Sequence, residues 1–305
     1  MMENADSHPS LSILIPVYNQ DVRALVADLY QSASAWGGHF EIRVADDGSA
    51  PETRRMNASI SSLPGVAYRE MPHNVGRSAI RNALISWARY PYLILMDADS
   101  AVVRPDYVSA YMREVVPDTV ICGGRTYAPE RPSDPSLHLH WRYGRRREQR
   151  TAAQRNAKPW HGFQTNNYLI PADIAKQLPF DEQLVGYGHE DSLFGLRLQE
   201  SNIAVHHIDN PLCHLGLERA DVFLDKHSQA INNLTRLYHR GIILPVRLMD
   251  IWMHLHALGL AGPTRTISAL LTPLLKKNLM SSRPSLYAFD LYRLGQLLER
   301  SRNPL

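Results

Sequence analysis

The chain has 305 residues, of which 44% are hydrophobic and 21% are charged, and its net charge is +3. A chain of this length can bury a large core, and this composition excludes disordered and fibrous proteins. The small positive charge does not by itself indicate a nucleic acid partner, and none is expected. Two cysteines are too few for a disulfide framework, so a reducing compartment is favoured.

We expect no targeting segment and no membrane span in this sequence. Residues 1–9 carry acidic side chains and no apolar run, so we expect neither a signal peptide nor a transit peptide. Nowhere do about eighteen apolar residues run together, which argues against a conventional membrane span. We therefore expect a cytoplasmic protein, and any membrane contact would be peripheral, on the inner face.

Strands and helices alternate through the first half of the sequence. Apolar runs predict strands at 11–17, 41–45, 66–69, 92–96 and 119–122. Helical spacing, or a Pro or Gly start signal, predicts a helix after each of the first four strands. This alternation is typical of a mainly parallel sheet with helices on both faces. Polar clusters follow the first, second and fourth strands, so we expect them to meet at one edge of the sheet.

The fourth strand leads directly into two carboxylates. Residues 92–96 form an unbroken apolar run, typical of a strand buried on both faces, and Asp97-Ala98-Asp99 follows. Carboxylates in that position are costly unless something pairs with them. Two acidic oxygens one residue apart suit a hard divalent cation that holds a phosphate. A plain turn is the alternative, because Asp and Ser favour turns.

The pattern is lost between residues 128 and 158, where prolines precede a basic and aromatic tract at 141–147. A solvated loop or helix face explains such a charge run. The sharper interpretation is a mobile segment near the site that meets an anionic acceptor or a lipid surface. Strand character returns at 163–170 and again at 203–208.

Acidic residues and a histidine follow in the next third. Gly186-Tyr187-Gly188-His189 precedes Glu190 and Asp191, which open a short amphipathic helix. The helix dipole alone explains acids in a first turn, whereas two glycines indicate close approach of the backbone to something. His214 comes after the strand at 203–208, and a single histidine is usually structural.

Beyond residue 217 the sequence predicts helices. One apolar stripe contains Leu248, Ile251, Trp252 and Leu255, and a second contains Ile267, Leu270, Leu271, Leu274 and Leu275 with Lys276 and Lys277 beside it. Core-facing helices are the default explanation for such stripes, and a membrane-surface face is the alternative.

The segments ILIPVYN, VADDGS, NVGRSAIRN, LMDADS and GYGHEDSLF, in this order, resemble the inverting family-two glycosyltransferases of the GT-A fold. The resemblance implies an α/β fold, the GT-A nucleotide-diphospho-sugar transferase fold, with a mainly parallel Rossmann-like sheet and a helical carboxy-terminal extension. It also implies a division into an N-terminal tail at 1–10, a catalytic domain at 11–216 and a helical extension at 217–305.

The same resemblance assigns roles to individual residues. It implies donor-binding contacts from Pro16, Tyr18, Asp46, Asp47, Arg81, Asn82, Asp97 and Asp99. It implies that Asp99 and His214 ligate Mn²⁺ or Mg²⁺, that Asp191 is the catalytic base, and that Glu190 positions the acceptor. Acceptor contacts are expected from Trp160, Asn167 and His189, the last standing where relatives often have Gly or Trp.

The function implied is metal-dependent transfer, with inversion, of a sugar from a nucleotide-sugar donor, expected to be a UDP-sugar. The acceptor would be a hydroxyl group of a glycan or lipid-linked molecule in polysaccharide or cell-surface glycan synthesis. A sugar nucleotidyltransferase is one alternative, but its Gly-rich loop after the first strand is missing here. The other is a non-catalytic sugar-nucleotide-binding subunit, for which Asp99, Asp191 and His214 together would have no chemical use.

Overall fold

The computed structural model of the chain describes residues 9–301, so most of the predicted tail at 1–10 lies outside the described residues. The chain forms two compact units. Of the described residues, unit 1 contains 9–126, 150–183 and 197–216, and unit 2 contains 127–149, 184–196 and 217–301. The predicted boundary at 216 is thus one edge of unit 1, while two earlier segments group with the carboxy-terminal helices.

Unit 1 is built on a seven-stranded sheet with the order β3-β2-β1-β4-β8-β6-β9. Its strands are β1 (Leu11–Val17), β2 (Phe40–Asp46), β3 (Val66–Glu70), β4 (Tyr92–Met96), β6 (Thr119–Cys122), β8 (Asn167–Pro171) and β9 (Ala204–His207). The first four pair in parallel, as do β6 and β9, and only β8 runs antiparallel to both of its neighbours. The prediction of a mainly parallel sheet is confirmed.

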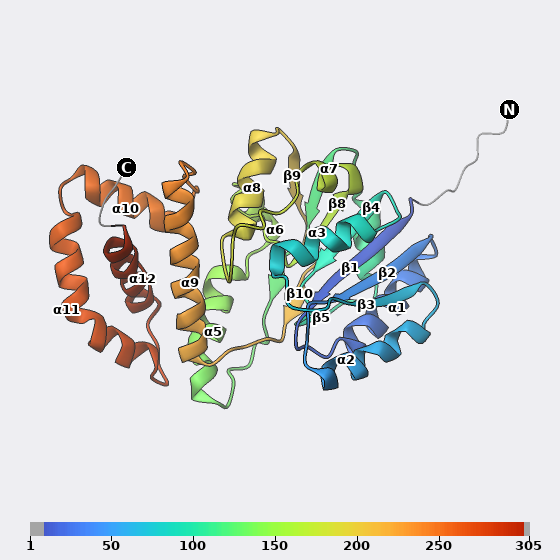
Figure 1. The fold of residues 1–305 in the computed structure, drawn as a ribbon, viewed down its shortest axis with the longest axis horizontal. Coiled ribbons are helices and arrows are strands. Elements are labelled where there is room, and N and C mark those ends of the chain that lie inside the picture. Colours follow the sequence, from blue (N-terminus) through green and yellow to red (C-terminus); the bar gives the residue numbers. More distant parts are fainter. Residues whose placement is uncertain (1–8, 302–305) are drawn as a thin grey trace. The chain divides into compact units, whose positions relative to one another are not determined.

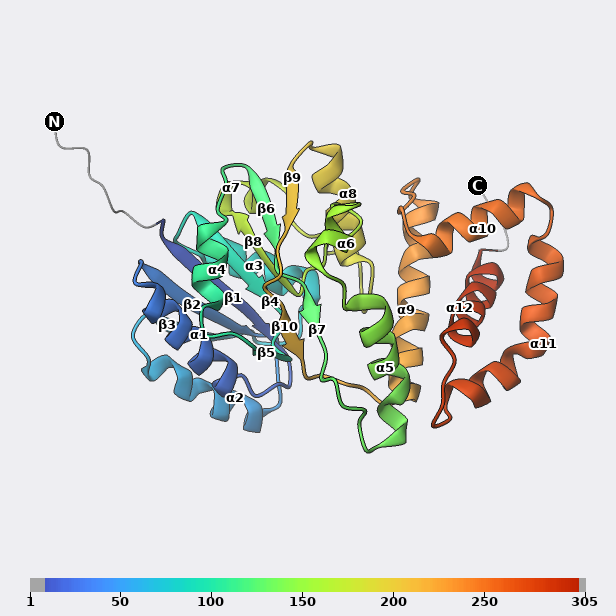
Figure 2. The same cartoon turned by 180° about the vertical axis from the view of Figure 1, so that it is seen from behind.

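Helices cover both faces of this sheet (Figures 1 and 2). The helices of unit 1 are α1 (Arg23–Trp36), α2 (Pro51–Ala58), η1 (Ser59–Ser62), α3 (Arg77–Trp87), α4 (Tyr107–Arg113), α6 (Ala152–Asn156) and α7 (Ala172–Gln177). α1 and α4 bury their apolar sides on one face, against alternate residues of β1, β2 and β4. α3 lies on the other face. Because the central strands are covered on both sides, they are continuous apolar runs.

A second, three-stranded sheet brings distant segments together beside the end of β4. It contains β5 (Ser100–Val102), β7 (Arg125–Thr126) and β10 (Leu212–His214), in the order β5-β10-β7. β10 runs antiparallel to β5, with His214 opposite Ser100. The N–H of Leu215 donates to the carbonyl of Asp99 at 2.8 Å, which extends the pairing by one step. This register places His214 next to Asp99.

Unit 2 is helical. It contains η2 (Pro135–Leu137), α5 (His138–Tyr143), the π-helical turn η3 (Gly144–Glu148), α9 (Ala220–His239), α10 (Arg247–Ala257), α11 (Ala261–Leu279) and α12 (Leu286–Arg300). α8 (Glu190–Glu200) begins in it. Where the sequence pattern is lost, at 128–158, the structure forms helical turns over 135–148 and the helix α6, so the helix face is the alternative that holds there. Helices of three to six residues complete less than two turns, so they leave no apolar period to detect.

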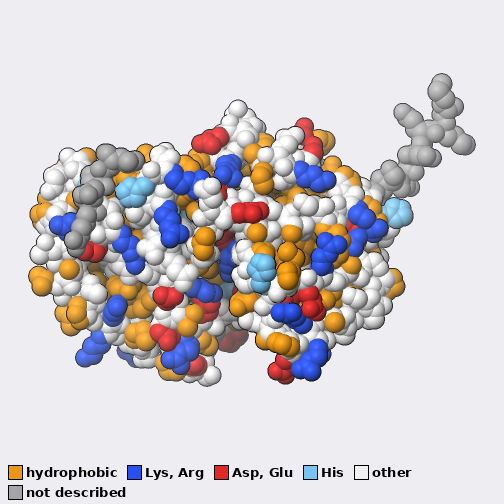
Figure 3. All heavy atoms as spheres, viewed as in Figure 1, with side chains coloured by type: hydrophobic (Ala, Val, Ile, Leu, Met, Phe, Trp, Pro, Cys, Tyr) orange, Lys and Arg blue, Asp and Glu red, His pale blue; other side chains and the backbone are white. Residues whose placement is uncertain are grey.

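Only part of the second predicted apolar stripe faces the core: Leu271 and Leu275 are half-buried, and Leu275 packs against a core cluster. α11 packs against α12 through a face that holds Ser268, which is 1% exposed. Ile267, Leu270 and Leu274 are 57%, 74% and 65% exposed. Figure 3 shows hydrophobic side chains at the surface along the edge where α11 runs. None of the helices in the described part of the chain has the length and hydropathy that a membrane crossing requires.

Candidate active site

Asp97 follows β4 directly and is held between two arginines. Arg81 Nη2 donates to Asp97 Oδ1 at 2.8 Å, and Arg125 Nη2 donates to Asp97 Oδ2 at 3.1 Å. The three side chains are only 18%, 3% and 14% exposed for Asp97, Arg81 and Arg125 respectively. Removing one member of so buried a group would leave a charge without compensation. Asp97 therefore fixes the directions of two guanidinium groups at the carboxyl edge of the sheet.

Asp99 and His214 form the second pair of this edge. His214 Nδ1 lies 3.4 Å from Asp99 Oδ1. Burial of Asp99 disfavours its charged form, but the His214 imidazole, followed by Arg125 and Arg77, holds the pKa of Asp99 well below its ordinary value. Gly216 passes so close that a Cβ there would lie 2.5 Å from Asp99 Oδ2. Only glycine leaves room for the carboxylate at this point.

The chemistry of this pair fits one divalent cation. Neighbouring ligand atoms on a Mg²⁺- or Mn²⁺-sized ion lie about 3 Å apart, close to the separation of Asp99 Oδ1 and His214 Nδ1. Among residues 9–301 no group of three or more His, Cys, Asp or Glu side chains is placed to hold a metal ion. Phosphate and water oxygens would have to complete the coordination, as is usual for Mg²⁺ with few protein ligands.

The acidic pair after β2 organises a loop of unit 1. Asp46 Oδ1 accepts from the N–H of Ser49 at 2.7 Å, and Asp46 Oδ2 accepts from the Tyr68 hydroxyl at 2.9 Å. Asp47 accepts from the two backbone N–H groups at 75–76, at 2.6 and 3.1 Å. Burial raises the pKa of Asp47, against these hydrogen bonds. Asp47 therefore shapes the backbone that leads into α3, and Asp46 shapes the turn after β2.

Pro16 and Tyr18 lie at the end of β1, beside that loop. Pro16 pairs in register with Ala45 of β2. Tyr18 is 56% exposed, so its ring is open to solvent. The next residue, Asn19, has a φ of 51° and accepts from the N–H of Ala50 at 2.8 Å. The turn after β1 is thus tied to the loop after β2, and it presents the tyrosine ring outward.

Asn82 and Asn167 are both engaged inside unit 1. Asn82 accepts from the N–H of Phe180 at 2.9 Å, and it donates to the Phe180 carbonyl at 3.0 Å and to Glu182 at 2.8 Å. Asn167 is 1% exposed. Its Oδ1 accepts from two tyrosine hydroxyls at 2.7 Å, and its Nδ2 donates to two carbonyls at 2.9 Å. In this conformation both amides serve the fold.

The predicted acceptor contact Trp160 also uses its polar atom, the indole Nε1, in a hydrogen bond within unit 1. Its Nε1 donates to the carbonyl of Ile203 at 2.8 Å. The indole thereby joins the segment before β8 to the segment before β9, which is a structural task. Its ring keeps a partly exposed face.

The predicted base lies in unit 2, in the first turn of α8. Burial, and then the neighbouring charge of Glu190, raises the pKa of Asp191 to about 6. Its Oδ1 accepts from the N–H of Ser192 at 2.7 Å. His189 has a φ of 70°, and burial lowers its pKa to about 4, so it is neutral at pH 7. His189 Nε2 is buried, and no described residue hydrogen-bonds to it.

The glycines before α8 approach another helix. A Cβ on Gly188 would lie 2.5 Å from the Cβ of Ala230, and Gly188 has a φ of 100°. Asn233 Nδ2 donates to the carbonyls of Tyr187 and Gly188 at 3.3 and 3.2 Å. The close backbone approach that the glycines predict is confirmed, and the neighbour is α9.

The model of the family described as glycosyl transferase family 2 matches residues 12–170. The chain belongs to glycosyl transferase family 2. It is 29% identical over 235 residues to validoxylamine A glucosyltransferase from Streptomyces hygroscopicus subsp. limoneus, an alignment that covers 66% of this chain and 51% of that protein. The chain thus spans about half the length of this relative, and less than two thirds of the other curated relatives it matches.

Two solved structures resemble the fold. The mannosyltransferase PcManGT from Pyrobaculum calidifontis, in complex with GDP-Man and Mn²⁺, has a TM-score of 0.58 at 13% identity, over 97% of this chain and 87% of that one. Glucosyl-3-phosphoglycerate synthase from Mycobacterium tuberculosis, in complex with Mn²⁺, UDP and glucosyl-3-phosphoglycerate, has a TM-score of 0.52 at 15% identity, over 77% and 81%. At these identities the likeness shows the fold alone, and it confirms the predicted GT-A fold.

Arg125 and Arg77 of this family-two chain were not predicted from the sequence as residues of the candidate site. Arg125 stands on the two-residue strand β7, which is too short to leave a pattern, and it reaches Asp97 from a distant segment. Arg77 acts on the Asp99 carboxylate through its charge. Its spacing from Arg81 is i, i+4 on α3, which places both side chains on one helix face and could have indicated a basic cluster.

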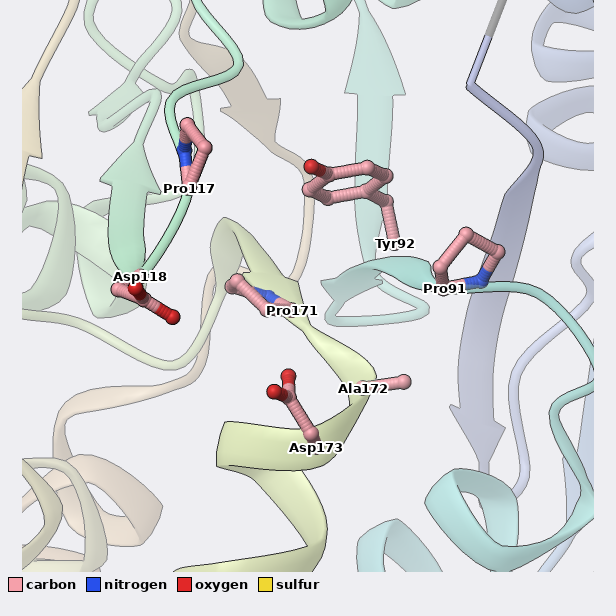
Figure 4. A pocket seen from close by; sticks show the side chains of 7 residues that line it. All are labelled: Pro91, Tyr92, Pro117, Asp118, Pro171, Ala172 and Asp173. Carbon is pink, nitrogen blue, oxygen red and sulfur yellow. The ribbon is translucent and has the colours of Figure 1, made fainter.

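A cavity of about 400 Å³ lies at the opposite end of β4 from Asp97 (Figure 4). It is lined by Pro91, Tyr92, Pro117, Asp118, Pro171, Ala172 and Asp173. Figure 4 shows both aspartate side chains at this cavity, and its lining contains no basic residue. Because its charged groups would repel a diphosphate, it is not a candidate donor site in the family-two fold.

Proposed function

We propose that this family-two chain is a metal-dependent inverting glycosyltransferase. It moves a sugar from a nucleotide-sugar donor, with a UDP-sugar as the donor we expect, to a hydroxyl group of a glycan or lipid-linked acceptor in polysaccharide or cell-surface glycan synthesis. The observation that carries the proposal is the Asp99–His214 pair beside an Asp97 carboxylate gripped by Arg81 and Arg125.

The donor base is assigned to the ends of β1 and β2. The exposed Tyr18 ring offers a face for stacking on a base, and Pro16 lines the pocket through its backbone. Asp46 and Asp47 hold the loop that forms the rest of the pocket. Similar structures contain UDP or GDP-Man, so the base must be decided by binding measurements.

The diphosphate is assigned to the carboxyl edge of β4. Arg81 and Arg125 supply positive charge there, and Asp97 keeps both guanidinium groups oriented before a substrate arrives. Preorganised charge of this kind stabilises a leaving group without reorganisation during the reaction. Asp99 and His214 are the residues that would hold Mn²⁺ or Mg²⁺, which when bound would supply positive charge to the diphosphate leaving group.

Asp191 is assigned as the base that takes the proton from the acceptor hydroxyl. A pKa of about 6 leaves the carboxylate ionised at pH 7, and it is a stronger base than an ordinary aspartate. Inversion requires such a base on the face of the sugar opposite the leaving group. Glu190 raises the basicity of Asp191 through its charge and is assigned to position the acceptor. His189, which is neutral at pH 7 and whose buried Nε2 has no hydrogen-bond partner among the described residues, is assigned to contact the acceptor.

The proposal is tested by a thermal-shift matrix of UDP- and GDP-sugars with Mn²⁺, Mg²⁺ or a chelator. A ligand that binds the native state raises the melting temperature by mass action. We expect a UDP-sugar to raise it only with a divalent cation, and release of UDP to follow when an acceptor glycan is added. Asp99→Asn should reduce the shift, because it weakens binding of the cation and the donor.

Asp118→Asn is the matched control, because Asp118 is exposed and its φ of 55° is one that Asn adopts readily. This variant should keep the wild-type shift. An equal shift in the chelator would contradict the assigned metal site, and a larger shift with GDP-sugars would replace UDP as the donor nucleotide.

A further inference from the structure

The segment between Leu258 and Met280 concentrates exposed hydrophobic side chains. Six of the fifteen exposed large hydrophobic residues in the described part of the chain lie there: Leu258, Leu260, Ile267, Leu270, Leu274 and Met280. Single exposed hydrophobic residues are ordinary on a protein surface, whereas a cluster of them marks an interaction site. Figure 3 shows such side chains along the edge formed by α11.

The geometry of α11 turns part of this cluster into a stripe. Ile267, Leu270 and Leu274 follow the spacing i, i+3, i+7, which places them on one helix face. The opposite part of the helix is occupied, since Ser268 and Leu279 are buried and Gly295 of α12 meets Ser268 closely. The stripe is therefore the free side of a helix that is already anchored by its other side.

The charge of this region has one sign. From residue 251 to residue 289 the sequence contains no Asp or Glu, but it contains Arg265, Lys276, Lys277 and Arg283. Lys277 stands three residues after Leu274, so it continues the line of the stripe. Figure 3 shows Lys or Arg side chains at one end of the same edge. Such a surface complements a partner that is apolar and negatively charged.

An aromatic side chain marks the same end of the region. Tyr287, in the first turn of α12, is 85% exposed. It follows the end of α11 by eight residues, just beyond Arg283. Tyrosine beside lysine and arginine is typical of residues that lie at the level of lipid headgroups, where the ring is partly in an apolar layer and the hydroxyl is in water.

We propose that the α11 surface, defined as residues 258–287, docks in the plane of a bilayer that contains anionic lipids. The stripe on α11 would enter the boundary between headgroups and acyl chains, and the basic side chains would contact lipid phosphates. This inference goes beyond the proposed sugar transfer. It depends only on the surface of unit 2, so it can fail or succeed whichever donor is used.

Flotation with vesicles tests the proposal. The full chain is mixed with vesicles of phosphatidylcholine alone or of phosphatidylcholine with phosphatidylglycerol. We expect retention on the anionic vesicles at low salt and its partial loss at high salt, because the Debye length shortens. Leu270→Ser/Leu274→Ser should lower the partition coefficient by at least about tenfold, since each leucine removed from water contributes on that scale. Lys276→Gln/Lys277→Gln should reduce retention and its dependence on salt.

The control is Val116→Ser/Ile243→Ser, which removes two hydrophobic side chains that are 53% and 51% exposed outside the α11 surface. It should bind like the wild type. A tryptophan placed at position 270 by Leu270→Trp should be quenched by brominated lipids. Wild-type retention by the leucine variant, or equal retention on neutral vesicles, overturns the proposal. So does a dimer in sedimentation equilibrium that Leu270→Ser/Leu274→Ser dissociates, because the stripe would then serve a second copy of the chain.

Discussion

The molecule has two acidic pairs, Asp97-Ala98-Asp99 and Glu190-Asp191. They are similar in sequence, but the charges around them differ in sign. In unit 1, cationic partners surround the carboxylates, and the pKa of Asp99 is held low. In unit 2, burial and a like charge raise the pKa of Asp191 to about 6. The first arrangement suits the proposed cation site, because it keeps a carboxylate ionised, and the second suits the proposed base, because it favours proton uptake. The two proposed roles are therefore separated by the neighbours of each pair and not by residue type.

The largest expected effect comes from Asp191→Asn. This change keeps the size of the side chain but removes its basicity, so turnover should fall on the order of a hundredfold or more. Binding of the UDP-sugar with Mn²⁺ should hardly change. Transfer assays paired with calorimetric donor titrations measure both, and Asp225→Asn, an exposed acid on α9, should behave like the wild type. Loss of donor binding by Asp191→Asn would show that the two pairs share one task.

Asp191→Asn, which should lower turnover, should instead increase the stability of the fold. The pKa of Asp191 is raised from its ordinary value near 3.8 to about 6, so its favourable contribution is complete below pH 4 and is lost as the pH rises through 6. Asp191→Asn imitates the protonated form. It should therefore increase the free energy of unfolding at pH 8 by about 2 kcal/mol, allowing for partial exposure, and leave it unchanged near pH 4.

Chemical denaturation of both proteins between pH 4 and pH 8 checks this, and wild-type turnover should fall as the pH drops through about 6. A stability difference that does not depend on pH would falsify the assigned environment of Asp191.

On the unit 1 side, Asp99→Asn and His214→Asn should each weaken metal affinity about tenfold or more, by analogy with the loss of other metal-site contacts. Both should also weaken the donor, because the cation and the diphosphate bind together. Titration of Mn²⁺ in the presence of UDP measures the coupling. If either variant keeps wild-type affinity for Mn²⁺ and UDP, the pair does not hold the metal.

The unit 1 pair was easier to predict from sequence than its surroundings. The unbroken run at 92–96 and the polar clusters after β1, β2 and β4 gave the parallel core and its edge, because both are local signals. Arg125 was missed, since a two-residue strand has no period and its partner Asp97 is 28 residues away. The saturation of Asn167 by two tyrosines depends on tertiary packing that no spacing records.

Unit 2 was predicted less well. The helices after residue 217 are confirmed, but α5 and η3 are too short for a periodic signal. Amphipathic spacing predicted the apolar stripe on α11 but not whether the stripe faces the core or the solvent. Periodicity identifies an apolar face of a helix, but only the fold decides which face a neighbouring element covers. In α11 the neighbour α12 covers the side that holds Ser268.

The smallest expected effect concerns His227, which, like Asp191, is a buried titratable group of unit 2. His227 is 7% exposed among the rings of Phe223, Tyr143 and Phe289, at centroid distances of 4.4, 5.3 and 4.8 Å. Its two ring nitrogens are buried, and no described residue hydrogen-bonds to them. Burial, and then the charge of Arg293, lowers the pKa of His227 well below its ordinary value. Such a group weakens the fold because its polar atoms lose water and gain little.

His227→Phe should therefore increase the free energy of unfolding by about 1 kcal/mol at pH 8, since a ring of similar shape replaces a desolvated polar one. The native pKa is depressed, so the wild type loses stability as the pH falls below about 6.5 and the unfolded chain takes up the proton. The advantage of the variant should grow over that range. The comparison with unit 1 supplies the control: Asn167→Leu also replaces a buried polar side chain by an apolar one, but it strands two tyrosine hydroxyls and should destabilise. Denaturation curves for both variants at pH 8 and pH 5.5 measure these changes, and a destabilised His227→Phe would show that the histidine has a hydrogen-bonded partner, such as a buried water, after all.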